Sequence, residues 1–242
     1  MEFTSVEAIA AILTPLASRQ DAVLLRGSLK PGLDASLEYR RQFRGEDAVL
    51  QDCHRSWLAV DVDDLPAPDH ILRGSLASQA EFVRHQLPSE FHEAACVFAP
   101  TAKTGLSQGI RSRLWFMLTQ PASNTSLRAW AKTVNDDLGT KLVDGALFNP
   151  AQPHYVGRPR FIGMRDPCCG QVIGLLAGMS AVDLTLPQPH VTATNVHPTV
   201  TGSASVSGSG WRGQLVRIGG PDGIREPVRA ALPKPVACQA KL

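Results

Sequence analysis

Residues 57–64, Trp-Leu-Ala-Val-Asp-Val-Asp-Asp, constrain the fold more than any other stretch of the chain. The apolar residues predict a buried strand that ends before Pro66. In a strand, residues i and i+2 point to the same face, so the carboxylates of Asp61 and Asp63 are expected side by side. Two such carboxylates repel each other unless a positive charge lies between them, and Mg²⁺ or Mn²⁺ prefers hard oxygen ligands. The alternative is a strand that runs into a solvated acidic turn.

The bulk composition is that of a globular protein. The chain has 242 residues, of which 43% are hydrophobic and 19% are charged, and its formal net charge is +2. This is enough for a sizeable core, and the balanced charge does not by itself indicate nucleic-acid binding. The sequence has neither a membrane-spanning apolar run nor the layout of a signal peptide. Together with an odd number of cysteines, 5, this predicts reduced thiols and a cytoplasmic location.

The spacing of apolar residues predicts the other elements. Helices are predicted at residues 5–18, 76–87 and 123–138. Strands are predicted at residues 22–26, 57–64, 94–99 and 111–118, and a hairpin is expected to join the last two. A strand or turn is expected at 142–144, and short strands at 172–177 and 182–186. This mixture predicts an α+β fold in which helices cover one face of a sheet.

The composition changes after residue 186. Residues 187–210 are rich in Thr, Ser, Gly and Pro and carry almost no charge, which is typical of a linker. Residues 211–242 regain some apolar spacing and are expected to form a helical tail or the start of a further domain. The main domain is therefore predicted at residues 1–186.

Basic residues later in the chain provide a partner for the acidic strand end. Arg111 and Arg113 share a face of the predicted strand 111–118, and Lys103 lies in the loop before it. If this strand neighbours the strand that carries Asp61 and Asp63, the cations can hold a polyphosphate while the carboxylates hold metal ions that bridge to it. That is the arrangement for two-metal phosphoryl or nucleotidyl transfer. A solvated pair of arginines on an edge strand is the alternative.

Four further residues have expected places around this site. Asp144 follows an apolar pair and is expected to complete the acidic group, although an Asp at such a turn is also typical of a helix cap. His154 and Arg158 lie in a loop bounded by prolines and are candidates for contacts with template or nucleotide. Asp64 alternates to the other face of the strand and is expected outside the site.

The ordered set resembles a known family. An apolar strand that ends in Asp-x-Asp, a later strand that is basic and then apolar, and an apolar residue followed by Asp are similar to the three motifs of the archaeo-eukaryotic primase superfamily. The runs at 113–118 and 143–159 look like the primase–polymerase domains of phage, plasmid and integrated-element replication proteins. The resemblance covers roughly residues 20–180.

The resemblance implies an RRM-like mixed sheet with accessory α/β elements, and DNA primase or polymerase activity in the replication of a mobile element or phage. It makes Asp61, Asp63 and Asp144 the catalytic residues and ligands of Mg²⁺ or Mn²⁺. Arg113 stands where the family usually has a histidine that contacts the triphosphate. The implied nucleotide-binding residues are Arg113, Arg111, Lys103, His154 and Arg158.

The implied partners are nucleoside triphosphates, a single-stranded DNA template and a helicase, either further along a longer polypeptide or separate; no membrane is implied. Two other functions stay open. The arginine in place of the histidine suits a non-catalytic origin-binding or single-strand-binding module. The same carboxylates also suit a metal-dependent nuclease.

Overall fold

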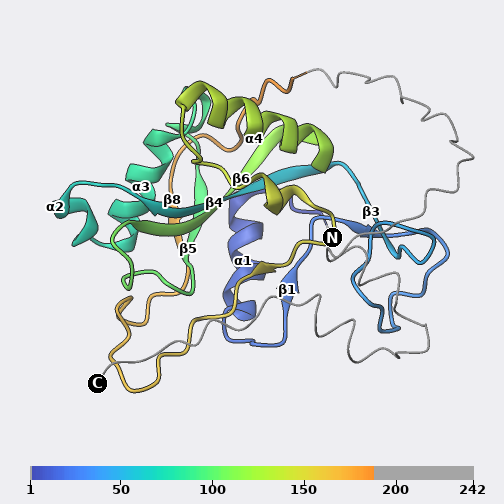
Figure 1. Ribbon diagram of the computed structural model, residues 1–242, viewed down its shortest axis with the longest axis horizontal. Coiled ribbons are helices and arrows are strands. Elements are labelled where there is room, and N and C mark those ends of the chain that lie inside the picture. Colours follow the sequence, from blue (N-terminus) through green and yellow to red (C-terminus); the bar gives the residue numbers. More distant parts are fainter. Residues whose placement is uncertain (1, 188–242) are drawn as a thin grey trace, which may run out of the picture. The chain divides into compact units, whose positions relative to one another are not determined.

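The computed structural model describes residues 2–187 (Figure 1). The predicted linker from residue 188 onwards and the predicted tail at 211–242 lie outside the described residues. No helix within the described range is long and apolar enough to cross a membrane.

A four-stranded antiparallel sheet in the order β4-β6-β5-β8 forms the centre of the fold. Its strands are β4 (Arg55–Leu65), β5 (Cys96–Pro100), β6 (Ile110–Ala122) and β8 (Gly174–Leu176). The predicted hairpin is confirmed, because β5 pairs with β6 and places Ala99 opposite Arg113. On its other side β6 pairs with β4, in a register that sets Arg113 opposite Asp61. The predicted acidic and basic strands are therefore neighbours.

Helices form at the three predicted places. They are α1 (Val6–Leu16), α3 (Leu76–Gln86) and α4 (Asn124–Leu138), and a short α2 (Asp69–Leu72) precedes α3. Serine side chains cap the three longer helices by accepting a hydrogen bond from a backbone amide of the first turn, as Ser123 does for α4. Helix α4 ends at Gly139, whose φ of 63° is left-handed.

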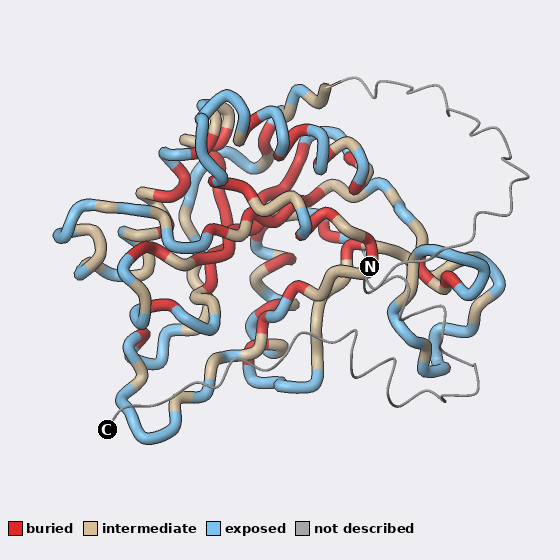
Figure 2. The backbone as a smooth tube through the Cα atoms, viewed as in Figure 1, coloured by how far each residue is buried: buried red, intermediate tan, exposed pale blue. Residues whose placement is uncertain are grey.

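Helices cover both faces of the sheet, not one face as predicted (Figure 1). Leu58, Val60 and Val62 of β4 lie in a core cluster with apolar residues of α3 and α4. The alternate residues Trp57 and Ala59 lie in a second cluster with residues of α1. Because β4 is apolar on both faces before Asp61, each face needs its own cover. Figure 2 shows the buried strands between these layers.

The remaining elements are short. β1 (Val23–Leu24) pairs with β7 (His154–Tyr155), and β2 (Ser28–Leu29) pairs with β3 (Leu50–Gln51). Two 3₁₀ helices, η1 (Ser89–Phe91) and η2 (Gly145–Phe148), complete the set. Residues 142–144 form a turn before η2, and residues 182–186 contribute an isolated bridge between Val182 and Leu118 instead of the predicted strand.

A buried arginine links strands β4 and β6 at the end of the sheet that lies away from Asp61. Arg26 is fully buried and donates to the carbonyl oxygens of Trp57 (3.0 Å) and Ala122 (2.9 Å) and to Oδ1 of Asn124 (3.1 Å). Its guanidinium also lies 5.3 Å from the centroid of the Trp57 ring. Burial lowers the pKa of Arg26 to about 10, so it stays charged at neutral pH. It fixes the start of β4 against the end of β6.

Candidate functional site

Asp61 and Arg113 form a cross-strand ion pair that is largely removed from water. Nη2 of Arg113 donates to Oδ2 of Asp61, and Nη1 donates to the carbonyl oxygen of Tyr155 at 3.0 Å. The two side chains are only 15% and 9% exposed, Asp61 first. The other carboxylate oxygen, Oδ1 of Asp61, is buried and has no hydrogen-bond partner among residues 2–187. The site thus holds an acceptor that still lacks a donor or a cation.

The pKa of Asp61 reports which charges surround it. Burial raises this pKa above its ordinary value, and the guanidinium of Arg113 opposes the increase. The negative charges of Asp63 and Asp144 raise the pKa further. Both predicted carboxylates are therefore near enough to act on Asp61.

A β-bulge places Asp63 and Asp64 around one arginine. The register of β4 against β6 shifts between Val62 and Leu65, and Asp64 has a left-handed φ of 57°. Arg111 binds Oδ1 of Asp63 through Nη1 at 2.6 Å, and binds Asp64 through Nε at 2.8 Å and through Nη2. The hydrogen bonds from Arg111, and then from Ser107, lower the pKa of Asp64 to about 2. Strict alternation fails at the bulge, so Asp64 shares Arg111 with Asp63, while Asp64 itself lines a separate hollow with Ser107 and Gln108.

Gly109 makes room for this bulge. A Cβ atom added to Gly109 would lie 2.4 Å from the carbonyl carbon of Asp64, closer than real Cβ contacts allow. The loop before β6 is held by Thr104, whose hydroxyl donates to the carbonyl oxygen of Arg111 at 2.6 Å and accepts from the amide of Thr101 at 2.8 Å. The glycine and the threonine together position the arginine that the two acids share.

A cavity of about 400 Å³ opens beside these pairs. Its lining includes four basic side chains that the sequence analysis assigned to the site, Lys103, Arg111, Arg113 and Arg158, and the carboxylate of Asp63. Gln20 and Tyr155 complete part of its wall, and no sequence signal indicated them. Lys103 has no ion pair among residues 2–187, whereas Arg158 binds Oδ2 of Asp166 at 2.6 Å. Positive charge thus exceeds negative charge in the lining of this cavity.

Asp144 lies near β4, but its carboxylate caps a helix and does not bind the arginines that pair with Asp61 and Asp63. It caps η2 by accepting from the amide of Ala146 at 3.4 Å, and it pairs with Nζ of Lys141 at 3.1 Å. Within the described part of the chain, no three or more His, Cys, Asp or Glu side chains are grouped so that they could hold a metal ion. Asp61, Asp63 and Asp144 each have a basic counterion, and within residues 2–187 the three carboxylates are not grouped closely enough to hold one metal ion together.

His154 lies away from the cavity. Its side chain is fully buried, its Nε2 is 3.3 Å from the carbonyl oxygen of Leu147, and its ring packs edge to face against Trp57. Burial lowers the pKa of His154 to about 3, and the charge of Arg113 lowers it in the same direction. Because the ring is fully buried and does not line the cavity, it cannot contact a nucleotide bound in the cavity. The proline-bounded position suggested a surface loop, but pairing of β7 with β1 buries this residue.

Comparison of the chain with protein-family models, with curated proteins and with solved structures gave no match.

Proposed function

We propose that the chain catalyses template-directed nucleotidyl transfer from nucleoside triphosphates on single-stranded DNA, as a primase or polymerase in the replication of a mobile element or phage. One observation carries the proposal. Lys103, Arg111, Arg113 and Arg158 line a single cavity with the carboxylate of Asp63, and Asp61 lies next to it. A triphosphate needs such concentrated positive charge, and a metal-dependent transfer needs carboxylates beside it.

The arginines and carboxylates are proposed to exchange partners when a nucleotide binds. Arg111 presents a planar guanidinium that suits bidentate contact with phosphate oxygens, and Lys103 adds a point charge. Once phosphate oxygens replace the carboxylates on Arg111, Asp63 is free to accept a cation. Arg113 keeps Asp61 oriented, because a second donor contact to the Tyr155 carbonyl holds the guanidinium in place.

The carboxylates fit Mg²⁺ or Mn²⁺ in their chemistry. Asp61 offers the buried Oδ1, which no group in the described range hydrogen-bonds, Asp63 offers an exposed carboxylate, and Asp144 lies close enough to change the pKa of Asp61. When bound there, these ions would supply activation of a 3′-hydroxyl and neutralisation of the leaving pyrophosphate.

The order of elements is compatible with an RRM-like core. β4, α3, β5, β6 and α4 follow one another as βαββα, and β6 lies between β4 and β5 in the sheet. The βαββαβ fold begins in this way. β8 lies beside β5 and so leaves β4 at the edge of the sheet, near the proposed site.

A non-catalytic module that binds single-stranded DNA is a second candidate. The observation in its favour is that a cation neutralises each carboxylate and that residues 2–187 contain no ready metal-binding group. A site in which the ion pairs persist would bind phosphates through the remaining positive charge and would have no need of a metal.

Incorporation of labelled nucleotide on a primed and an unprimed single-stranded template, with Mg²⁺ or Mn²⁺, tests both candidates. The variants are Asp61→Asn and Asp63→Asn. The matched control is Asp136→Asn, which removes the same charge from an exposed position on α4. The proposal predicts incorporation by wild type and control and a loss of at least about 100-fold in both site variants.

Each other outcome assigns a different function. Equal incorporation by wild type, both site variants and the control would refute the catalytic role of Asp61 and Asp63. Metal-independent DNA binding without incorporation would favour the non-catalytic module. Shortening of the template without any nucleotide requirement would show a nuclease.

A further inference from the structure

Residues 158–165 form a loop in which basic and apolar side chains are interleaved, Arg-Pro-Arg-Phe-Ile-Gly-Met-Arg. The loop contains no acidic residue. Ile162 is 92% exposed and Met164 is 49% exposed, which is unusual for large apolar side chains. Arg160 and Arg165 are exposed and have no ion pair with any residue in the described range. Such a loop exposes both free positive charge and apolar surface.

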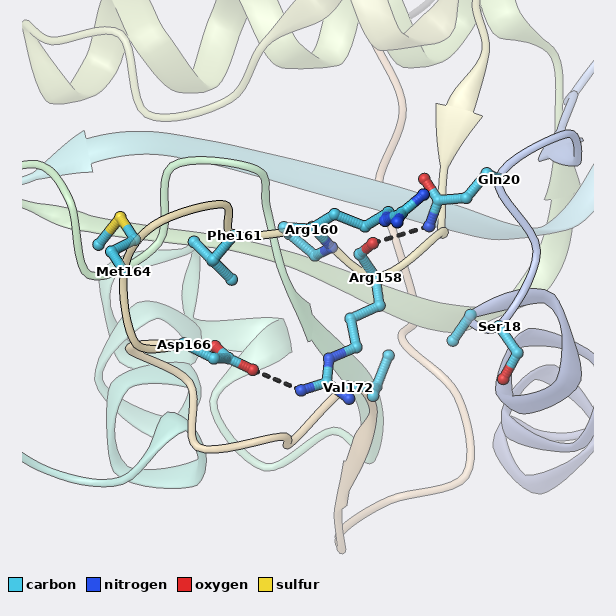
Figure 3. A pocket seen from close by; sticks show the side chains of 10 residues that line it. Ser18, Gln20, Arg158, Arg160, Phe161, Met164, Asp166 and Val172 are labelled. Carbon is cyan, nitrogen blue, oxygen red and sulfur yellow. Dashed lines mark hydrogen bonds and ion pairs between the residues drawn. The ribbon is translucent and has the colours of Figure 1, made fainter.

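A hollow of about 600 Å³ lies beneath this loop, between it and the end of α1 (Figure 3). Arg158, Arg160, Phe161 and Met164 line it from the loop, and Ser18 and Gln20 line it from the segment after α1. Figure 3 shows Phe161 and Met164 on one side of Arg158 and Ser18 on the other. Half-buried Phe161 thus borders an open space beside two arginines.

The hollow and the smaller cavity share a wall. Gln20, Arg158 and Pro159 line both. The backbone of Arg158 is fixed at two points, because its amide donates to the Ala17 carbonyl oxygen at 2.8 Å and its own carbonyl oxygen accepts from Nε2 of Gln20 at 2.9 Å. Its guanidinium is held by Asp166. A ligand in the hollow would therefore lie directly beside whatever occupies the smaller cavity.

We infer that residues 158–165 and this hollow bind a strand of single-stranded nucleic acid, with phosphates on Arg160 and Arg165 and a base against Phe161. Proteins that bind single strands combine positive charge along the backbone with side chains on which bases pack, and this loop supplies both within eight positions. The strand's role as template depends on the proposed function; its binding does not.

The hollow favours a strand over a membrane surface. An interfacial membrane loop presents its apolar side chains outward and needs no recess. Here Phe161 borders a recess that is also lined by Arg160 and by Arg158, whose charge Asp166 in the same lining balances, so an aromatic ring and Arg160, which is unpaired within residues 2–187, flank a volume that can take a planar base and its phosphate. Binding to anionic vesicles is therefore included as the competing outcome.

Fluorescence anisotropy of a labelled oligothymidylate of about 20 nucleotides tests the inference. The full chain is titrated without metal or nucleotide at several KCl concentrations. The variants are Arg160→Ala and Phe161→Ala. Lys132→Ala is the control, because it removes one positive charge from an exposed position of α4, a helix that packs on the other face of the sheet from α1.

The two variants are expected to differ in how they weaken binding. Arg160→Ala should reduce the slope of log affinity against log salt by about 0.7, because one phosphate contact is lost. Phe161→Ala should weaken binding roughly fivefold or more with the slope unchanged, because it removes stacking and not charge. Arg160→Lys should restore the slope, and Phe161→Leu, which keeps an apolar side chain, should still weaken binding. Lys132→Ala should bind like wild type.

Unchanged affinity and slope in the Arg160 and Phe161 variants would overturn the inference. So would binding to phosphatidylserine vesicles, but not to DNA, with dependence on the same residues. The assay separates this inference from the proposed function. Binding that depends on these residues, without nucleotide incorporation, would refute only the transfer reaction. Incorporation together with unaffected binding by the loop variants would refute only the assignment of the loop.

Discussion

Acid should destabilise this protein through His154, which the fold keeps neutral. Burial lowers the pKa of His154 from 6.5 to about 3. In the unfolded chain the same ring takes up a proton near pH 6.5, so between pH 6.5 and about 3 the unfolded state binds one proton more than the folded state. The free energy of unfolding therefore falls as the pH falls through this window. At 1.36 kcal/mol per pH unit, the His154 contribution lost at pH 5 is about 2 kcal/mol.

A comparison of pH dependences isolates this contribution from the carboxylates. Urea unfolding of wild type and His154→Gln is followed by far-UV circular dichroism at pH 7.5 and pH 5. The glutamine does not titrate, and its amide can still donate to the Leu147 carbonyl oxygen. Wild type should lose about 2 kcal/mol more than the variant between the two pH values. The control is His70→Gln on exposed α2, which should lose as much as wild type. Equal losses in wild type and His154→Gln would refute the reasoning.

Three further perturbations follow from the geometry. Gly109→Ala should lower the free energy of unfolding by about 1–3 kcal/mol, seen as a lower Tm, because its Cβ meets the Asp64 backbone; an unchanged Tm would contradict the close approach. Arg26→Met should lower the free energy of unfolding, measured by urea unfolding, by about 3 kcal/mol or more, because buried carbonyl oxygens lose their donor. An unfolding midpoint equal to that of wild type would show that Arg26 does not stabilise the sheet. Arg111→Ala should raise the pKa of Asp64 from about 2 towards its ordinary value in a carboxyl NMR titration, and a pKa that stays near 2 would assign the effect elsewhere.

Local patterns predicted the elements that build the sheet and its covering helices. The apolar run before Asp61 and the helical spacing of 123–138 depend on neighbours in sequence, and both elements form where predicted. The pairing of Asp61 with Arg113 follows once two strands are adjacent, because each side chain has a fixed face.

Long-range contacts decided the features that the sequence did not predict. The bulge at Asp64 depends on the close approach of Gly109 from another loop, so alternation along β4 alone did not predict that Asp63 and Asp64 share one arginine. His154 is flanked by polar residues and prolines, and its burial follows from pairing with Leu24, far earlier in the chain. The second covered face arises because α1 packs against β5 and β6, a contact that the helical spacing of α1 does not specify.

The position of β4 at the end of the strand order adds a constraint that is independent of chemistry. Within the described part of the chain, this strand of 11 residues pairs on one side only, and such a strand is a template for association with another chain. Charged side chains and bulges are the usual protection against such association, and β4 carries both in its last residues, at Asp61, Asp63 and Asp64. These acids are therefore expected to protect the edge of β4 from association whatever chemistry the site performs. Variants that remove several of these acids together are expected to aggregate.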